Sequence, residues 1–132
     1  MVKTGTDIVI LSDKNICKDN AAIPIILLVS AVNQRLIATG MRFFTSIIAE
    51  TGQAVSTHDT ACILGFGASA VCPLTVYSRI LELTQDKNEI LGKLAYYQKA
   101  IEKALMKTMG KFGLCTAESY IGGEFFESNF LD

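Results

Sequence analysis

The sequence predicts an α/β fold in which alternating β/α units build a parallel sheet. Short apolar runs rich in β-branched residues alternate with longer segments of helical periodicity along the 132 residues, as in proteins whose parallel strands are joined by crossover helices. The short runs are apolar at nearly every position, which is typical of strands covered on both faces. Four such units are half of a (β/α)8 barrel. We therefore expect a partial, TIM-barrel-like sheet with open edges and an apolar inner face.

Four runs have the length and composition of buried strands. The first, TDIVILSD, ends in polar residues, and the second ends where Gly52 opens a turn. The third is closed by Pro73, and the fourth is LCTAESY. The expected strands cover residues 6–13, 42–52, 68–73 and 114–120.

The intervening segments have helical periodicity or helix-boundary residues. Pro24 fits the first turn of the first helix, and Gly40 is its expected stop. Ser56 or Thr57 is the candidate N-cap of the second helix. Gly113 ends the longest helix, whose lysines lie away from its apolar stripe. The expected helices cover residues 23–40, 56–67, 74–84, 89–113 and 121–130, with a polar loop at 85–89.

The composition favours a protein that rests against other protein. Half of the residues are hydrophobic, only 19% are charged, and the formal net charge is −1, whereas an ordinary domain carries about 25% charged residues. Lysine and arginine never form a block in the sequence, so the chain lacks the basic patch expected of a nucleic-acid-binding protein. No repeat or linker stands out, and residues 1–132 are treated as one segment.

Membrane insertion is the other explanation for a high apolar content. The longest apolar run, Ala21 to Val32, is shorter than the roughly 20 residues that span a bilayer. The N-terminus lacks a signal-peptide pattern, because Ser12 and Asp13 interrupt its apolar run. We therefore expect a soluble protein in the cytoplasm, or in a plastid if the source is a plant.

The cysteines and the single histidine form no metal-binding pattern. Cys17, Cys62, Cys72 and Cys115 include no CxxC pair, and one histidine cannot complete a zinc-finger pattern. Without secretion signals, free buried thiols are expected rather than disulfides.

His58 and Cys62 are one helical turn apart, so their side chains are expected to meet. The functional interpretation is a thiolate activated by an imidazole. The structural interpretation is a helix that buries Cys62, and it is favoured because Asp59 is wrongly spaced to orient the histidine.

The glycines of GFGASA, Gly65 and Gly67, resemble a dinucleotide-binding loop only loosely. Such a loop follows a strand and opens a helix, whereas these glycines end a predicted helix and lead into a strand. A helix stop with close packing is therefore expected.

If the barrel prediction holds, chemistry belongs at the carboxyl ends of the strands. The candidates at these ends are Asp13, Glu50, Ser119 and Tyr120. Asp13 and Glu50 would be either paired carboxylates or groups that cap helices and bind backbone N–H groups, and the lack of metal-ligand spacing favours capping. The Gly122–Gly123 pair is a candidate anion-binding turn without a basic partner.

Three stretches of the sequence resemble the central domain of the glutamate synthase large chain. The stretch IVILSDKN corresponds to LILSDRG in the family. The stretch ETGQAVSTHDTACILGFGASAVCP corresponds to ETGEAREVHHFALLLGYGADAVNP. The third stretch begins with YQKAIEKAL and ends with GGEFFE, and it corresponds to a family stretch that begins with YIKALEKGL and ends with GAQIFE. The resemblance spans residues 7 to 131, which is the C-terminal part of that domain. The family has no cysteine at the position of Cys62, and Asn33-Gln34-Arg35 replaces a run of three histidines.

The resemblance implies a scaffold rather than a catalytic segment. In glutamate synthase, glutamine, 2-oxoglutarate and a reductant yield two glutamate, which assimilates ammonia. An amidotransferase domain releases the ammonia, and an FMN and iron–sulfur domain makes glutamate; the central domain joins them. No catalytic, cofactor-binding or metal-binding residue is carried over to this chain, and the neighbouring domains of the parent chain are the expected partners.

Two further hypotheses stay open beside a fragment of a glutamate synthase large chain, which is expected to be inactive in isolation. The chain could be a stand-alone α/β protein that self-associates and binds a ligand at the strand ends, where Asp13, Glu50 and Tyr120 would face it. It could also be an interaction module that pairs through its exposed sheet edge.

Overall fold

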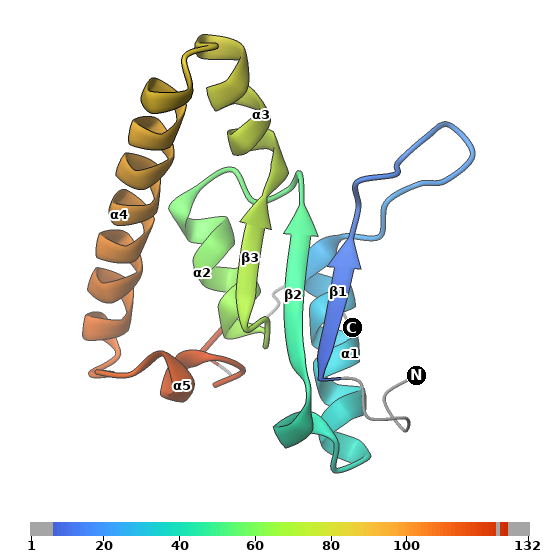
Figure 1. The fold of residues 1–132 in the computed structure, drawn as a ribbon. Helices are drawn as coiled ribbons and strands as arrows, with labels where there is room; N and C mark the ends of the chain where they lie inside the picture. Colours follow the sequence, from blue (N-terminus) through green and yellow to red (C-terminus); the bar gives the residue numbers. More distant parts are fainter. Residues whose placement is uncertain (1–6, 124, 127–132) are drawn as a thin grey trace.

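The computed structural model describes residues 7–123 and 125–126 and shows a three-stranded parallel sheet with helices packed beside it (Figure 1). The strand order is β1-β2-β3, and both pairs are parallel. This confirms the predicted α/β class, and the arrangement is compatible with part of a barrel. The elements are β1 (Ile8–Ser12), α1 (Ile25–Ala38), the 3-10 helix η2 (Arg42–Phe44), β2 (Ser46–Thr51), α2 (Thr57–Gly65), β3 (Ala70–Pro73), α3 (Leu74–Leu83), α4 (Lys87–Lys111) and α5 (Ala117–Tyr120).

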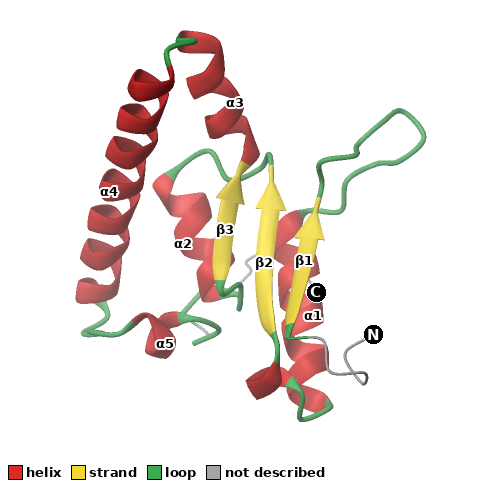
Figure 2. Ribbon diagram, viewed as in Figure 1, coloured by secondary structure: helices red, strands yellow, loops and turns green. Residues whose placement is uncertain are grey.

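The main core lies between one face of the sheet and helices α1 and α2, which pass behind the strands in Figure 2. Because side chains alternate along a strand, Leu11, Ala49 and Val71, which are aligned by the strand register, point to this side. Buried Val29 of α1 and Ile63 of α2 pack against them.

The other face of the sheet is open. Ile10 and Ile48 are aligned across β1 and β2 on this face, and Ile8 and Ile10 of the edge strand are 53% and 60% exposed. Strands covered on both faces were expected, but the described helices cover only one. The open apolar face has the place that the inner face of a barrel would have.

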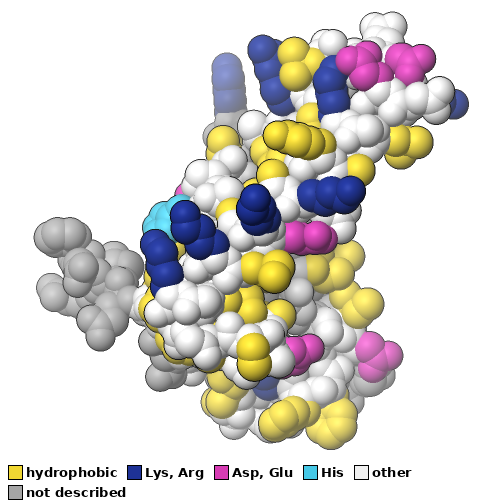
Figure 3. Space-filling model, turned by 90° about the vertical axis from the view of Figure 1, so that its left-hand side faces the viewer, with side chains coloured by type: hydrophobic (Ala, Val, Ile, Leu, Met, Phe, Trp, Pro, Cys, Tyr) yellow, Lys and Arg dark blue, Asp and Glu magenta, His cyan; other side chains and the backbone are white. Residues whose placement is uncertain are grey.

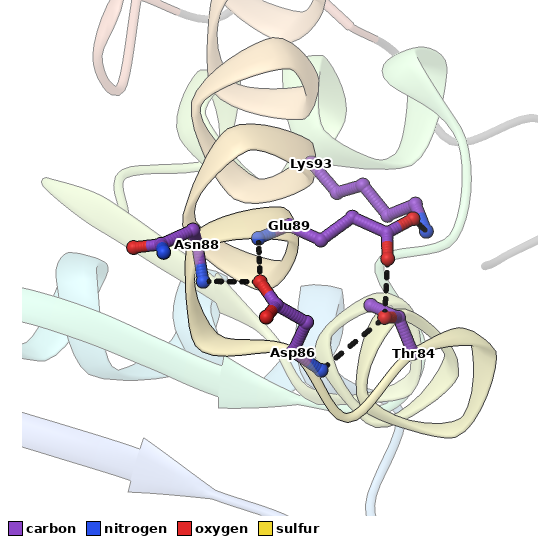
Figure 4. Close-up of polar contacts among 5 residues, drawn as sticks. All are labelled: Thr84, Asp86, Asn88, Glu89 and Lys93. Carbon is purple, nitrogen blue, oxygen red and sulfur yellow. Dashed lines mark hydrogen bonds and ion pairs between the residues drawn. The ribbon is translucent and has the colours of Figure 1, made fainter.

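Polar caps set where the helices begin. Ser56 starts α2 through a capping box, in which its hydroxyl accepts from the Asp59 N–H and the Asp59 carboxylate accepts from the Ser56 N–H at 2.8 Å. Asp86 starts α4 by accepting from the N–H groups of Asn88 and Glu89, both at 2.9 Å (Figure 4). The helix therefore begins at Lys87, inside the predicted loop.

The predicted C-terminal ends of the first and longest helices, at Gly40 and Gly113, are confirmed. Gly40 and Gly113 lie two residues after the last residues of α1 and α4 and adopt φ values of 69° and 74°, a conformation that glycine takes most easily. No helix within the described parts of the chain is both long and apolar enough to cross a membrane.

The predicted fourth strand at 114–120 is wrong. Thr116 instead precedes the short helix α5, which follows α4 and lies near the amino ends of the strands (Figure 1). The aromatic ring of Tyr120 packs against Ala61 and Met109, so burial in this second cluster replaces strand pairing.

Two other boundaries also differ from the predictions. Residues 42–44 form η2, and β2 begins only at Ser46. Residues 121–123 and 125–126 are not helical, whereas the rest of the predicted helix at 121–130 lies outside the described residues.

Candidate functional site

The carboxyl ends of β1 and β2 gather polar groups around Asp13. Its carboxylate accepts hydrogen bonds from the Thr51 hydroxyl at 2.5 Å, the Gly52 N–H at 2.9 Å and the Gln53 amide at 3.1 Å. Partial burial raises the pKa of Asp13, but these hydrogen bonds together outweigh it, so the net pKa is lowered. Asp13 therefore ties β1 to the turn after β2.

Glu50 points to the opposite side of the sheet from Asp13. The strand register aligns Ser12, Glu50 and Cys72 in one row on the open face, and the Ser12 hydroxyl donates to the Glu50 carboxylate. Partial burial, and then the nearby Glu50 carboxylate, raise the pKa of Cys72. The structure thus does not bring Asp13 and Glu50 together as a carboxylate pair, and Cys72 is kept as a neutral thiol.

A cavity of about 590 Å3 opens beside these strand ends, between the loop after β1 and helix α3. Asp13, Lys14 and Gly52 line it from the sheet side, and Arg79 and Glu82 line it from α3. Arg79 and Glu82 are ion-paired at 2.7 Å, so two of its charges already neutralise each other.

We expect Asp13→Asn to destabilise the fold by about 1–3 kcal/mol, because an amide replaces a carboxylate that accepts three hydrogen bonds. Since the pKa of Asp13 is lowered in the fold, its contribution is present above the unfolded pKa and is lost as the pH falls through the folded value. Urea denaturation between roughly pH 6 and pH 3 measures this. An acid loss of stability that is equally steep in the variant would contradict the prediction.

The other two candidates, Ser119 and Tyr120, are not at a strand end. Both belong to α5, near the opposite end of the sheet (Figure 1). Tyr120 is 1% exposed, and its hydroxyl donates to the Ala61 carbonyl at 3.0 Å. Ser119 is exposed and lies 2.9 Å from the Thr116 hydroxyl. Tyr120 is therefore a packing residue in this structure.

Alkaline pH should weaken the fold through Tyr120. Burial, and then the nearby Cys62 thiol, raise the pKa of Tyr120 from 10.0 to about 12. Between these values the unfolded chain loses this proton before the folded chain does, so stability falls as the pH rises. Tyr120→Phe should shallow the decline between about pH 10 and pH 12, as measured by denaturation at each pH. Unchanged steepness in the variant would show that other groups cause the decline.

His58 and Cys62 do meet, but not as a reactive pair. The Cys62 sulfur is 3.5 Å from His58 Nε2. Burial, and then the Asp59 charge, raise the pKa of Cys62, which is the reverse of what an activated thiolate needs. Asp59 is engaged in the capping box of α2. The structural interpretation of this pair is therefore the one that the geometry supports.

Gly65 is the last residue of α2, and Gly67, two residues further on, packs closely within a network that the sequence did not reveal. Gly67 has a φ of 119° and lies against the buried side chain of Asn33. The Arg42 guanidinium donates to Asn33 Oδ1 at 2.6 Å, to the Thr45 carbonyl at 2.7 Å and to the Gly67 carbonyl at 2.9 Å. From the sequence, only the helical position of Asn33 could be predicted, and not its contact with Arg42.

The Gly122–Gly123 turn does not offer free donors to an anion. The Gly122 N–H donates to the Leu64 carbonyl at 3.3 Å, and the Gly123 N–H donates to the Tyr120 carbonyl at 3.1 Å. The predicted anion-binding role is therefore not supported by the geometry.

Nearly the whole sequence matches a known family model. The model of the glutamate synthase central domain matches residues 1–131. The chain belongs to the glutamate synthase central domain family. This match confirms the resemblance that the sequence analysis found in three stretches of the chain.

Several glutamate synthases are similar to the chain over 96% of its length. The ferredoxin-dependent glutamate synthase of Cyanidium caldarium is 37% identical, and the chloroplastic ferredoxin-dependent enzyme of Spinacia oleracea is 34% identical. The glutamate synthase [NADPH] large chain of Bacillus subtilis is 36% identical. The chain spans about 9% of the length of these relatives.

The donor set in this segment does not fit an iron–sulfur cluster. The four cysteines lie on separate elements and loops, and within the described ranges no three His, Cys, Asp or Glu residues are grouped to hold a metal ion. The turn that resembled a phosphate site has its N–H groups bonded within the protein, so it does not fit the phosphate of FMN either.

Proposed function

We propose that this chain is a structural segment of the central domain of a glutamate synthase large chain. In this role it joins an amidotransferase domain to an FMN domain and supplies no catalytic residue of its own. The parent enzyme would convert glutamine, 2-oxoglutarate and a reductant into two glutamate. Its FMN and iron–sulfur cluster would be bound outside this segment.

The open face of the sheet is the observation that carries this proposal. Isoleucines of β1 are exposed on a sheet face without helices. This exposure is unfavourable, because burying one such apolar side chain stabilises a protein by about 1.5–3 kcal/mol. A covering segment supplied by the rest of the large chain removes this cost. A chain that spans about 9% of its relatives leaves ample sequence to provide such a cover.

The polar groups at the strand ends support a scaffold role. Asp13 is satisfied by three donors and Glu50 by Ser12, so neither is poised as a free general base. The partners would be other domains of the same chain. The location would be the cytoplasm, or a plastid, as the name of the spinach relative suggests.

A hybrid enzyme tests the proposal. This chain would replace the matching segment of the Bacillus subtilis large chain, and glutamate formation would be measured. We expect the hybrid to be active and the isolated chain to be inactive with the same substrates. Turnover by the isolated chain, or a hybrid that is folded but never forms glutamate, would contradict the proposal.

Variants of the open face sharpen this test. Ile10→Asp should change the stability of the isolated chain by less than about 1 kcal/mol, because Ile10 is already exposed. In the hybrid it should abolish assembly, because the charge would be buried under the covering segment. Ile37→Asp on the exposed side of α1 is the matched control, and it should leave the hybrid active.

A stand-alone protein that self-associates and binds a ligand at the strand ends is the second candidate, and the 590 Å3 cavity beside Asp13 favours it. Light scattering with a flavin absorbance scan separates the two. A dimer without flavin would mean that self-association covers the open sheet. A dimer whose stability rises with an added small molecule, and falls back in Asp13→Asn, would favour the second candidate.

A further inference from the structure

Helix α4 carries a strongly basic outer surface. Its 25 residues include six lysines, at positions 87, 93, 99, 103, 107 and 111, against Glu89 and Glu102. The helix thus has a formal charge of +4 in a chain of net charge −1. Figure 3 looks onto the α4 side of the molecule and shows lysine and arginine side chains spread over it among apolar ones.

Four of these lysines form one ridge, which we call the lysine ridge: Lys99, Lys103, Lys107 and Lys111. They follow one another at every fourth position, so they lie along one side of the helix about 6 Å apart. The apolar residues Leu105 and Met109 of α4 pack into the core with Ala61, and all four lysines are exposed.

No interaction within the described residues explains the ridge. The ion pairs found there are Arg79–Glu82 and Lys93–Glu89, and Glu102 accepts from the Gln98 amide at 2.9 Å. Unpaired like charges four residues apart destabilise a helix by a few tenths of a kcal/mol per pair. The lysine ridge therefore slightly destabilises the isolated fold.

We propose that the lysine ridge is a docking surface for an acidic α-helix of another protein. A helix whose carboxylates recur at every fourth residue presents them about 6 Å apart, which matches the spacing of the lysines. Such a partner would pair each lysine with a carboxylate and exclude water along the ridge, because opposite charges set the register of an interface.

Charge and shape favour this occupant over two others. A second copy of the chain would bring its own lysine ridge and repel the first. A nucleic-acid-binding domain is usually basic overall, whereas this chain has a formal net charge of −1. Gly110 has open space beyond its Cα within the described structure, and it lies between Lys107 and Lys111, where a partner helix could approach closely.

The test uses the chain itself and synthetic probes. The probe is an alanine-rich peptide of about 20 residues with glutamate at every fourth position, titrated at low salt and followed by NMR shifts of the α4 amides. A peptide of the same composition with glutamates two residues apart is the control, because its charges face different directions. We expect binding of the first peptide at least about tenfold tighter than of the second.

Variants of the chain show which surface binds the acidic peptide. Replacing the four ridge lysines with glutamine should weaken binding about ten- to hundredfold, because each exposed pair contributes about 0.2–1 kcal/mol. The matched control replaces Lys14, Lys18, Lys87 and Arg35, which are also exposed, with glutamine. Replacing the four ridge lysines with arginine keeps the positive charges and should keep the affinity. Retained affinity in this variant would show that the loss in the glutamine variant comes from the lost charges.

Several outcomes would overturn the proposal. Equal binding of the two peptides, or equal weakening by both glutamine variants, would mean unspecific attraction. No binding at low salt would leave the ridge a solvated surface. Tighter binding of a single-stranded oligonucleotide or of anionic lipid vesicles through the same lysines would assign the ridge to another class of partner. None of these results depends on whether the hybrid large chain is active.

Discussion

Replacing Gly67 with alanine is expected to destabilise the fold by about 2–4 kcal/mol. Gly67 has a φ of 119°, a conformation that side chains other than glycine adopt only with strain. A Cβ at this position would overlap Asn33 Cγ and lie 2.7 Å from Asn33 Oδ1. Asn33 cannot yield freely, because it is 4% exposed and its amide oxygen accepts from Arg42.

Chemical denaturation of Gly67→Ala and Gly40→Ala separates the two causes. Gly40 also has a positive φ, 69°, but a Cβ there would meet nothing within 4 Å. Gly40→Ala therefore measures backbone strain alone and should cost about 1 kcal/mol. Equal losses in the two variants would show that the contact with Asn33 contributes nothing.

The sequence predicted the sheet and the main helices because their signals are local. Apolar runs such as IVILS and AVCP were bounded by polar residues or proline, and the structure has strands there. Capping and glycine stops were also local, so Ser56 and Gly113 were placed correctly.

The failed predictions needed information about distant contacts. LCTAESY has the composition of a short strand, but Tyr120 is buried against α2, and its hydroxyl reaches Ala61, which is far away in the sequence. Asp13 and Glu50 were grouped because both end a strand. The strand register puts their side chains on opposite faces of the sheet, and neither the register nor the donors from Thr51 and Gln53 can be derived from spacing alone.

Arg42→Ala is expected to destabilise the fold by about 2–4 kcal/mol. The guanidinium donates to Asn33 Oδ1, the Thr45 carbonyl and the Gly67 carbonyl. It thereby joins α1, the start of β2 and the junction between α2 and β3. Removing it would leave the buried Asn33 oxygen without this donor, and an unsatisfied buried acceptor costs more than the net value of a normal hydrogen bond.

Arg42→Lys distinguishes the shape of the guanidinium from its charge. An ammonium group keeps the charge but cannot present the planar fork that reaches three acceptors, so the variant should recover less than half of the stability lost in Arg42→Ala. The matched control is Arg35→Ala at an exposed position of α1, which should change stability by no more than about 0.5 kcal/mol. Full recovery in Arg42→Lys would mean that charge alone matters, and the three directed hydrogen bonds would then not be the reason that this corner of the fold holds together.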